Sequence, residues 1–122
     1  MTHCFVVDTY AWLEYLGGNV SYKQLMDETP LKTPIIVLAE LSRVFRRRGV
    51  KEADAQRMIE NISGRSVILP LDSVHAVGGG ALAENEKLAL VDAIIYSYAS
   101  NDEKLLTGDE HFRGKKNVLL VK

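Results

Sequence analysis

The stretch that decides the fold is Cys4–Val7, with the sequence CFVV, together with the Asp8-Thr9 pair that follows it. Four consecutive apolar residues that include two β-branched valines predict a strand buried on both faces. The Asp8 side chain is suited to cap a helix, which we expect over residues 10–16, before a glycine pair ends it. A buried strand that leads at once into a helix is the first half of a βαβ unit.

The same alternation of strand and helix continues along the chain. Further strands are predicted at 31–33, 67–69, 105–106 and 118–121, and further helices at 20–27, 34–48, 51–62, 74–87 and 92–99. We expect Pro34 in the first turn of its helix, and Gly64 to close the helix at 51–62. Strands that alternate with helices predict an α/β fold, in which right-handed crossovers build a parallel sheet covered on both faces.

Three consecutive glycines at 78–80 interrupt the helix predicted at 74–87. Each glycine costs a helix about 1 kcal/mol relative to alanine. The run either kinks the helix or lets another element approach it closely, and the sequence leaves both explanations open.

Composition excludes several classes of protein. The chain has 122 residues, a net charge of −1, one cysteine, 47% hydrophobic and 25% charged residues, which is typical of a single globular domain over residues 1–122. A lone Cys4 excludes an internal disulfide, and no apolar run approaches the roughly 20 residues of a membrane span. No basic-then-apolar leader is visible, so we expect a soluble, cytoplasmic protein with no membrane partner.

The charges nearly cancel but are segregated along the chain. Residues 1–34 sum to −2, residues 35–66 to +3, residues 67–112 to −6 and residues 113–122 to +4. A net charge near zero argues against a nucleic-acid ligand, because proteins that bind nucleic acids are usually basic. The concentration of acids between two basic segments raises the question of what those acids bind.

Four carboxylates occupy positions where an acid is unexpected. Asp8 and Asp109 follow predicted strands. Glu40 flanks the apolar stripe of a helix, and Asp92 starts a helix. Ligand sites in α/β sheets form beyond the carboxyl ends of the strands, so the first two are expected at one edge. If all four converge, cations must offset their repulsion, and hard divalent ions such as Mg²⁺ or Mn²⁺ fit oxygen ligands. An all-carboxylate metal site points towards phosphodiester hydrolysis.

Each acid also has an ordinary structural explanation. The two aspartates at helix starts can act as caps, and Asp109 can form an Asx turn. Glu40 can form an ion pair with Arg43 or Arg47 on its own helix. None of the three histidines stands at zinc-ligand spacing from Cys4, so we expect all of them to be structural or exposed.

Four segments of the chain resemble, in order, the signature segments of the PIN-domain family. They are FVVDT at 5–9, LAEL at 38–41, VDAIIYSYA at 91–99 and LTGDEHF at 106–112. The resemblance covers essentially the whole chain and is strongest to the small toxins of VapBC-type toxin–antitoxin systems. It implies a three-layer α/β/α sandwich around a five-stranded parallel sheet with strand order 3-2-1-4-5.

The resemblance also implies a metal-dependent endoribonuclease that acts on RNA. Carried over by position, Asp8, Glu40, Asp92 and Asp109 hold one or two Mg²⁺ or Mn²⁺ ions, and Thr107 orients water or phosphate beside the last acid. The toxin branch further implies a homodimer and a cognate antitoxin protein. Two divalent ions would change the net charge from −1 to +3, which removes the objection to an RNA substrate.

Two basic groups are candidates for contacts with RNA phosphates. One, near the end of the helix at 34–48, includes Arg43 and Arg47, and the other includes Arg113 and Lys115. For the first group, the favourable interaction of cations with a helix C-terminus is an alternative explanation.

Four other functions are compatible with parts of the pattern. A non-catalytic PIN-like module that binds RNA or protein would be expected to lack some of the acids, whereas a free-standing RNA-processing nuclease would have the same sequence features. A phosphoacceptor signalling domain needs an acidic pair after the first strand, where Asp8-Thr9 supplies one acid. A haloacid-dehalogenase-like phosphatase needs an aspartate where Tyr10 stands.

Overall fold

The computed structural model describes residues 3–122 and contains one five-stranded sheet. The strands are β1 (Cys4–Val7), β2 (Leu31–Pro34), β3 (Val67–Leu69), β4 (Glu103–Thr107) and β5 (Val118–Leu120). The helices are α1 (Thr9–Leu16), α2 (Val20–Glu28), α3 (Ile35–Arg47), α4 (Glu52–Arg65), α5 (Ser73–Glu86), α6 (Leu90–Tyr96) and the 3₁₀ helix η1 (Glu110–Phe112). The strands and α-helices follow the predicted order with bounds that differ by a few residues, whereas the sequence does not predict η1.

The strand β1 lies at the centre of the sheet. The strand order is β3-β2-β1-β4-β5 and every pairing is parallel, as expected. Val7 of β1 pairs with Leu106 of β4, so these two strands end side by side. The strands β2 and β3 lie on one side of β1, and β4 and β5 lie on the other. The carboxyl ends of β1 and β4 therefore form a topological switch point, which is where α/β sheets bind ligands.

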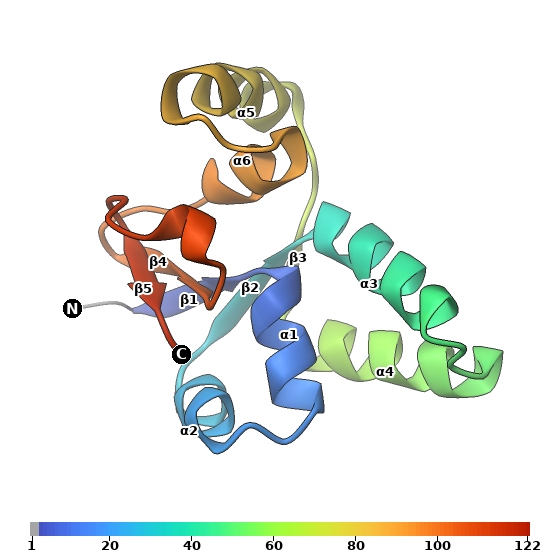
Figure 1. Cartoon of the computed structure of the whole chain (residues 1–122). Coiled ribbons are helices and arrows are strands. Elements are labelled where there is room, and N and C mark those ends of the chain that lie inside the picture. Colours follow the sequence, from blue (N-terminus) through green and yellow to red (C-terminus); the bar gives the residue numbers. More distant parts are fainter. Residues whose placement is uncertain (1–2) are drawn as a thin grey trace.

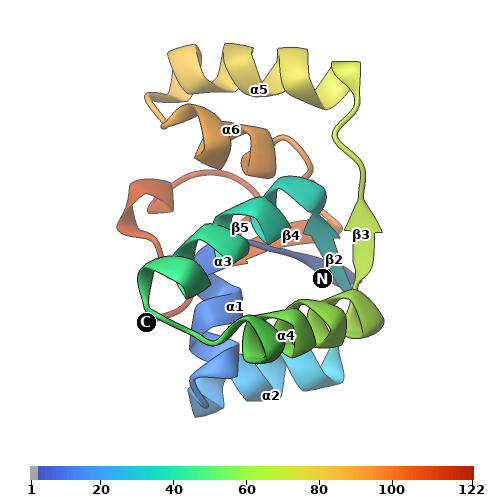
Figure 2. The same ribbon diagram turned by 90° about the vertical axis from the view of Figure 1, so that its right-hand side faces the viewer.

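Helices cover both faces of the sheet and produce the expected three layers. Figure 1 shows α5 and α6 on one side of the sheet and α1, α2 and α4 on the other. In the turned view of Figure 2, α3 lies between α6 and α4, both of which it contacts. Within residues 3–122, no helix is both long and apolar enough to span a membrane.

The central strands are buried because they are apolar on both faces. Phe5, Val6, Val7, Leu105 and Leu106 are all at most 3% exposed. The largest fully buried side chains that pack around them are Trp12, Tyr22 and Phe112. This packing confirms the predicted burial of the first strand on both sides.

Two helix boundaries differ from the prediction. Pro34 is the last residue of β2 and has an extended backbone, so α3 begins one residue later than expected. The helix α4 continues through Gly64 to Arg65, since burial of Ile62 holds its last turn and an internal glycine costs only about 1 kcal/mol.

One residue of the glycine run has a clear packing role. Gly79 of α5 is buried against α6, where an added Cβ atom would lie 2.6 Å from Ile94 Cγ1 and 2.8 Å from Ile94 Cα. Gly78 and Gly80 have no atom within 4 Å of such a Cβ. The helix α5 is continuous from Ser73 to Glu86, so Gly79 serves close helix approach rather than a break in the helix.

Candidate active site

Asp8 is a buried carboxylate that directly follows β1. The residue is 5% exposed, and its Oδ1 accepts a 2.8 Å hydrogen bond from the Ala11 backbone N–H. Its Oδ2 accepts a hydrogen bond from the hydroxyl of Thr107, which is 99 residues away in the chain. The first bond confirms Asp8 as the N-cap of α1, and the second joins the end of β1 to the end of β4. In this residue, a capping role and a position at the strand edge are compatible.

Thr107 links two of the acids through its hydroxyl group. The hydroxyl donates to Asp8 and accepts a 3.0 Å hydrogen bond from the backbone N–H of Asp109. Thr107 itself is completely buried. Gly108, between Thr107 and Asp109, allows close packing of two tyrosines, because a Cβ at this position would overlap the ring of Tyr10 and the hydroxyl of Tyr22. Asp8 and Asp109 are thereby brought to the same edge of the sheet, as the strand ends predict.

Glu40 points from α3 towards the end of β1. Its Oε1 accepts a 2.6 Å hydrogen bond from the hydroxyl of Thr9. Among residues 3–122, no ion pair joins Glu40 to Arg43 or Arg47, so the structure does not contain the pair that local spacing favours. The partner of Glu40 is instead 31 residues away in sequence, at the start of α1.

Asp92 reaches the same region from α6. The helix begins at Leu90, and Ala89 occupies the N-cap position with no side-chain capping bond, so the prediction that Asp92 caps this helix is wrong. Asp92 lies inside the first turn, where an acid interacts favourably with the helix dipole. One oxygen each from Asp92 and Asp109 and one ring nitrogen of His111 all lie within 4.8 Å of one another.

The electrostatics of Asp8 reflect both burial and neighbouring acids. Burial penalises the charged carboxylate and is the main reason that its pKa rises to about 7. Hydrogen bonds from Thr107 and Ala11 lower the pKa, and repulsion from Asp92 and Asp109 raises it further.

Asp92 has a similar environment. Burial raises its pKa first, repulsion from Asp109 and Glu40 raises it further, and His111 lowers it. Together with the neighbours of Asp8, these interactions place all four predicted acids in one electrostatic group.

This group of acids fits a divalent cation. In the part of the chain that the structure describes, no lysine or arginine forms an ion pair with any of the four carboxylates. Lysine and arginine side chains therefore do not offset their repulsion, and the basic group beside the acids is the imidazole of His111. Carboxylate oxygens are the ligands that Mg²⁺ and Mn²⁺ prefer, so the donor chemistry agrees with such an ion.

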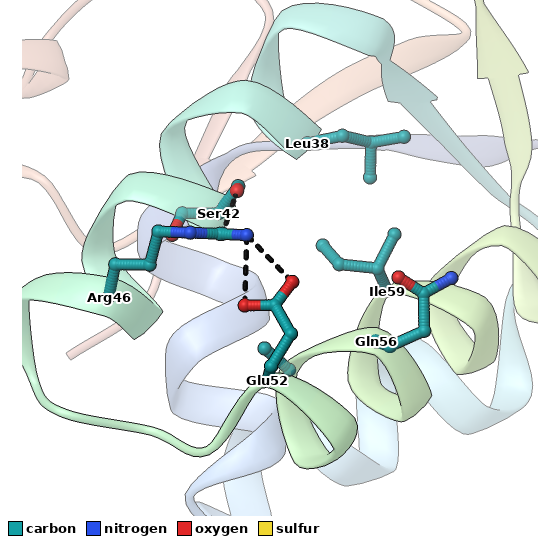
Figure 3. A pocket seen from close by; sticks show the side chains of 7 residues that line it. Leu38, Ser42, Arg46, Glu52, Gln56 and Ile59 are labelled. Atoms are coloured by element: carbon teal, nitrogen blue, oxygen red, sulfur yellow. Dashed lines mark hydrogen bonds and ion pairs between the residues drawn. The ribbon is translucent and has the colours of Figure 1, made fainter.

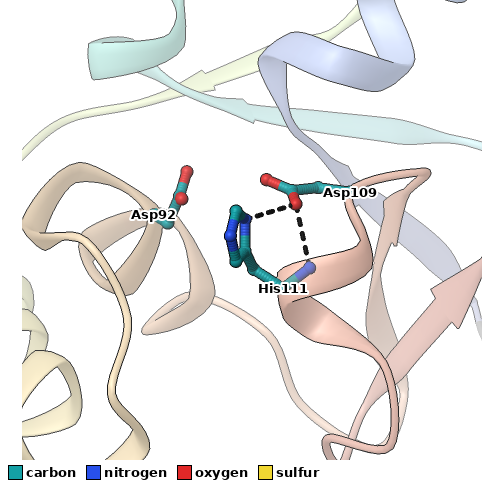
Figure 4. A group of neighbouring side chains, drawn as sticks. All are labelled: Asp92, Asp109 and His111. Atoms are coloured by element: carbon teal, nitrogen blue, oxygen red, sulfur yellow. Dashed lines mark hydrogen bonds and ion pairs between the residues drawn. The ribbon is translucent and has the colours of Figure 1, made fainter.

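His111 is a neighbour of the acids that sequence reasoning did not assign to the site. Its side chain is 80% exposed, in agreement with the prediction, but its Nδ1 lies 2.8 Å from Asp109 Oδ1. Figure 4 shows the imidazole between the carboxylates of Asp92 and Asp109. The signal that points to it is the two-residue spacing from Asp109, because the Asx turn that Asp109 forms brings both side chains together.

The four basic residues predicted to contact RNA fall into two classes. Arg43 and Arg47 are exposed on α3 and have no ion-pair partner among residues 3–122. Arg113 forms a bidentate ion pair with Glu110 at 2.8 Å, and the Lys115 Nζ lies 3.2 Å from a carboxylate of α5. Acids of the chain thus already neutralise the second pair.

A pocket between α3 and α4 lies apart from the carboxylates. Its volume is about 160 Å³, and Figure 3 shows the residues that line it: Leu38, Ser42, Arg46, Glu52, Ala55, Gln56 and Ile59. Arg46 and Glu52 form a 2.8 Å ion pair within it. None of the four acids lines this pocket, so it is not part of the candidate site.

Comparison with known proteins gives one family. The family model of the PIN domain matches residues 5–117, a range that includes the four acids and Thr107. A sequence comparison with curated proteins gave no significant match.

Solved structures share the fold of the whole chain. A toxin–antitoxin complex from Klebsiella pneumoniae contains a chain that is 24% identical, with 94% of this chain and 95% of that chain covered and a TM-score of 0.79. For VapBC2 from Rickettsia felis, bound to a DNA fragment from their promoter, the identity is 20%, both coverages are 97% and the TM-score is 0.73. For a Pyrobaculum aerophilum protein, the identity is 19%, the coverages are 99% and 91%, and the TM-score is 0.75.

Proposed function

Because the chain belongs to the PIN-domain family, we propose that it is a metal-dependent endoribonuclease that hydrolyses RNA phosphodiester bonds. The observation that carries this proposal is the convergence of four carboxylates where β1 and β4 end. A group of four carboxylates without a lysine or arginine partner suits divalent ions, and such ions suit phosphodiester hydrolysis.

The residues proposed to hold one or two Mg²⁺ or Mn²⁺ ions are Asp8, Glu40, Asp92 and Asp109. When bound, such ions polarise a phosphate and favour ionisation of water. The chain contributes by fixing its ligands before any ion arrives. Two hydrogen bonds hold Asp8, and the Thr9 hydroxyl holds Glu40. A cation also favours the charged form of Asp8, so we expect metal binding near neutral pH to release protons.

Thr107 is proposed as a positioning residue. Its hydroxyl donates to Asp8 and accepts from the backbone of Asp109, so it fixes the distance between two of the acids. The sequence-based expectation is that Thr107 orients water or phosphate. The hydrogen bonds support a role that acts through the carboxylates it holds.

Arg43 and Arg47 are the proposed primary contacts for RNA phosphates. They follow Glu40 by three and seven residues, which places all three on one face of α3. Neither arginine forms an ion pair with an acid within the described chain, so an RNA phosphate could bind them without displacing a carboxylate. Arg113 and Lys115 are proposed as secondary contacts, because each would exchange a carboxylate for a phosphate.

We further propose that the chain is the toxin of a VapBC-type pair, acts in the cytoplasm, and has an antitoxin and a second copy of itself as protein partners. Its likeness to a chain of a toxin–antitoxin complex and to VapBC2 supports this assignment. A free-standing RNA-processing nuclease is the alternative with the same site. Co-expression of the protein encoded by the adjacent reading frame separates the two, because only an antitoxin should relieve growth arrest caused by this chain.

Cleavage of a structured RNA by the full-length chain tests the proposed activity. We expect cleavage with Mn²⁺ or Mg²⁺ and none with EDTA. Asp8→Asn and Asp92→Asn should each lower the rate by at least about 100-fold, because each removes a charged ligand. Glu84→Gln, at an exposed position outside the acidic group, is the matched control and should retain the wild-type rate. Cleavage that survives EDTA and both site substitutions would refute the proposal.

The second candidate function is a non-catalytic module that binds RNA or protein through the same fold. The complete set of four acids favours the enzyme. Calorimetry with Mn²⁺ decides between them, since a chain that binds RNA but no divalent ion would fit the module and not the nuclease.

A further inference from the structure

His111 follows the last of the four acids and lies at the open side of the site. The residue belongs to η1, the single 3₁₀ turn that Asp109 caps through a 2.9 Å bond to the His111 backbone N–H. Its imidazole is fixed by a second bond, between Nδ1 and Asp109 Oδ1 at 2.8 Å. The first bond holds the backbone of the turn, and the second orients the exposed imidazole.

The hydrogen bond to Asp109 determines which ring nitrogen can act as a ligand. An ionised carboxylate only accepts, so Nδ1 must carry the proton of the neutral imidazole. The lone pair is then on Nε2, which has no hydrogen-bond partner among residues 3–122. In Figure 4, one ring nitrogen bonds to Asp109 and the other is on the side of Asp92.

This arrangement is the one that metal-binding histidines adopt. Such histidines almost always donate their second ring N–H to a carboxylate or carbonyl, which fixes the tautomer and makes the ligating nitrogen more basic. One nitrogen of His111 and one oxygen each from Asp92 and Asp109 lie within 4.8 Å of one another. Asp109 is the carboxylate that binds Nδ1, so Asp92 is the acid close enough to share an ion with Nε2.

We propose that His111, through Nε2, is a nitrogen ligand of a divalent ion that Asp92 holds, with Asp109 as the carboxylate that orients its ring, and that it makes the site prefer Mn²⁺ and Co²⁺ over Mg²⁺. This inference rests on the metal site of the proposed function. Mg²⁺ binds almost exclusively oxygen, whereas first-row transition ions accept imidazole with increasing affinity from Mn²⁺ through Co²⁺. A mixed nitrogen and oxygen donor set therefore discriminates between ions that an all-carboxylate site would treat alike.

Pulsed electron paramagnetic resonance of Mn²⁺ bound to the full chain tests the ligand directly. We expect modulation from an imidazole nitrogen in the wild-type protein and its loss in His111→Gln. The matched control is His75→Gln. His75 makes the same kind of contact, with its Nδ1 2.7 Å from Asp72 Oδ1, but it lies outside the acidic group. The control should keep the signal.

Calorimetry of the same proteins tests the preference between ions. His111→Gln should weaken Mn²⁺ and Co²⁺ binding by about tenfold or more, with a change of less than about twofold for Mg²⁺. Bound Mn²⁺ without a nitrogen signal, or equal weakening for all three ions, would overturn the role of His111 and leave the metal site intact. If neither the wild-type chain nor any variant binds a divalent ion, the metal site fails and the inference fails with it.

Discussion

The buried carboxylate of Asp8 makes the stability of the metal-free protein depend on pH. Its pKa is about 7 in the folded chain, against 3.8 for an ordinary aspartate, so between these values the folded state binds more protons than the unfolded state. The free energy of unfolding therefore decreases as the pH rises from about 4 to about 7. Over this pH range, the ionisation of Asp8 lowers the free energy of unfolding by on the order of 3–4 kcal/mol.

Asp8→Asn should remove most of this dependence. The neutral amide can be buried without charge, so at pH 8 and in EDTA we expect the variant to be more stable than the wild-type protein. Mn²⁺ should raise the stability of the wild-type protein and not that of the variant. Urea denaturation at pH 5 and pH 8 measures these effects, with Glu84→Gln as the control. A wild-type stability that increases between these pH values in EDTA would contradict the expectation.

Single residues of the site differ in how far sequence predicts them. Asp8 and Asp109 are predictable because both follow buried strands, and the ends of neighbouring parallel strands meet at one edge. The partner of Glu40 is not, since helical spacing points to arginines on the same helix and the actual donor, Thr9, is remote in sequence. The two-residue spacing of His111 from Asp109 is informative only once Asp109 is known to form an Asx turn, and sequence reasoning offers that turn only as an alternative to metal binding.

At the scale of elements, the contact between α5 and α6 depends on one glycine. An alanine at position 79 would place a Cβ within 2.8 Å of two atoms of Ile94, and one of them is backbone. We expect Gly79→Ala to lower the free energy of unfolding by about 1–3 kcal/mol, because the overlap outweighs the gain in helix propensity.

Gly80→Ala is the matched control for this prediction. It makes the same change in the same helix, but nothing lies within 4 Å of the added atom. Only the higher helix propensity of alanine then changes the stability, so the variant should be more stable than the wild-type protein by about 0.5–1 kcal/mol. Urea denaturation of both variants measures the difference, and equal effects of the two substitutions would contradict it.

Element order is more predictable than element ends. Apolar runs and helical stripes identify the five strands and the six α-helices, because burial imposes those patterns, but they do not identify the short 3₁₀ helix η1. The ends depend on local competition, as at Pro34, which completes β2 and does not enter α3. The function of the glycine run also required the structure, since only the position of Ile94 separates Gly79 from its neighbours.

At the scale of the whole molecule, α5 carries an exposed apolar face. Val74 and Val77 are 73% and 75% exposed, and residues 73–83 contain no charged side chain. In Figure 1, α5 lies beyond α6 as the outer helix on its side of the sheet. Contiguous apolar surface is uncommon on monomers, and an uncharged helix face can meet its own copy across a two-fold axis without repulsion. We expect this face to form the homodimer interface.

Light scattering of the purified chain tests this expectation. The wild-type protein should have the mass of a dimer, and Val77→Glu should convert it to a monomer because two carboxylates would meet at the interface. Val20→Glu is the control, at a valine that is 66% exposed on α2. A monomeric wild-type protein, or a dimer that tolerates Val77→Glu, would exclude α5 as the interface.

The hydrogen bond between Thr107 and Asp8 has a consequence for synthesis, because it joins residues 99 positions apart. A growing chain leaves the ribosome from its N-terminus, so Asp8 and Glu40 emerge long before β4 can pair with β1. A chain that stalls before residue 103 therefore lacks β4, Thr107 and the last of the four acids, Asp109. The proposed metal site is therefore completed only when translation of the chain is nearly finished.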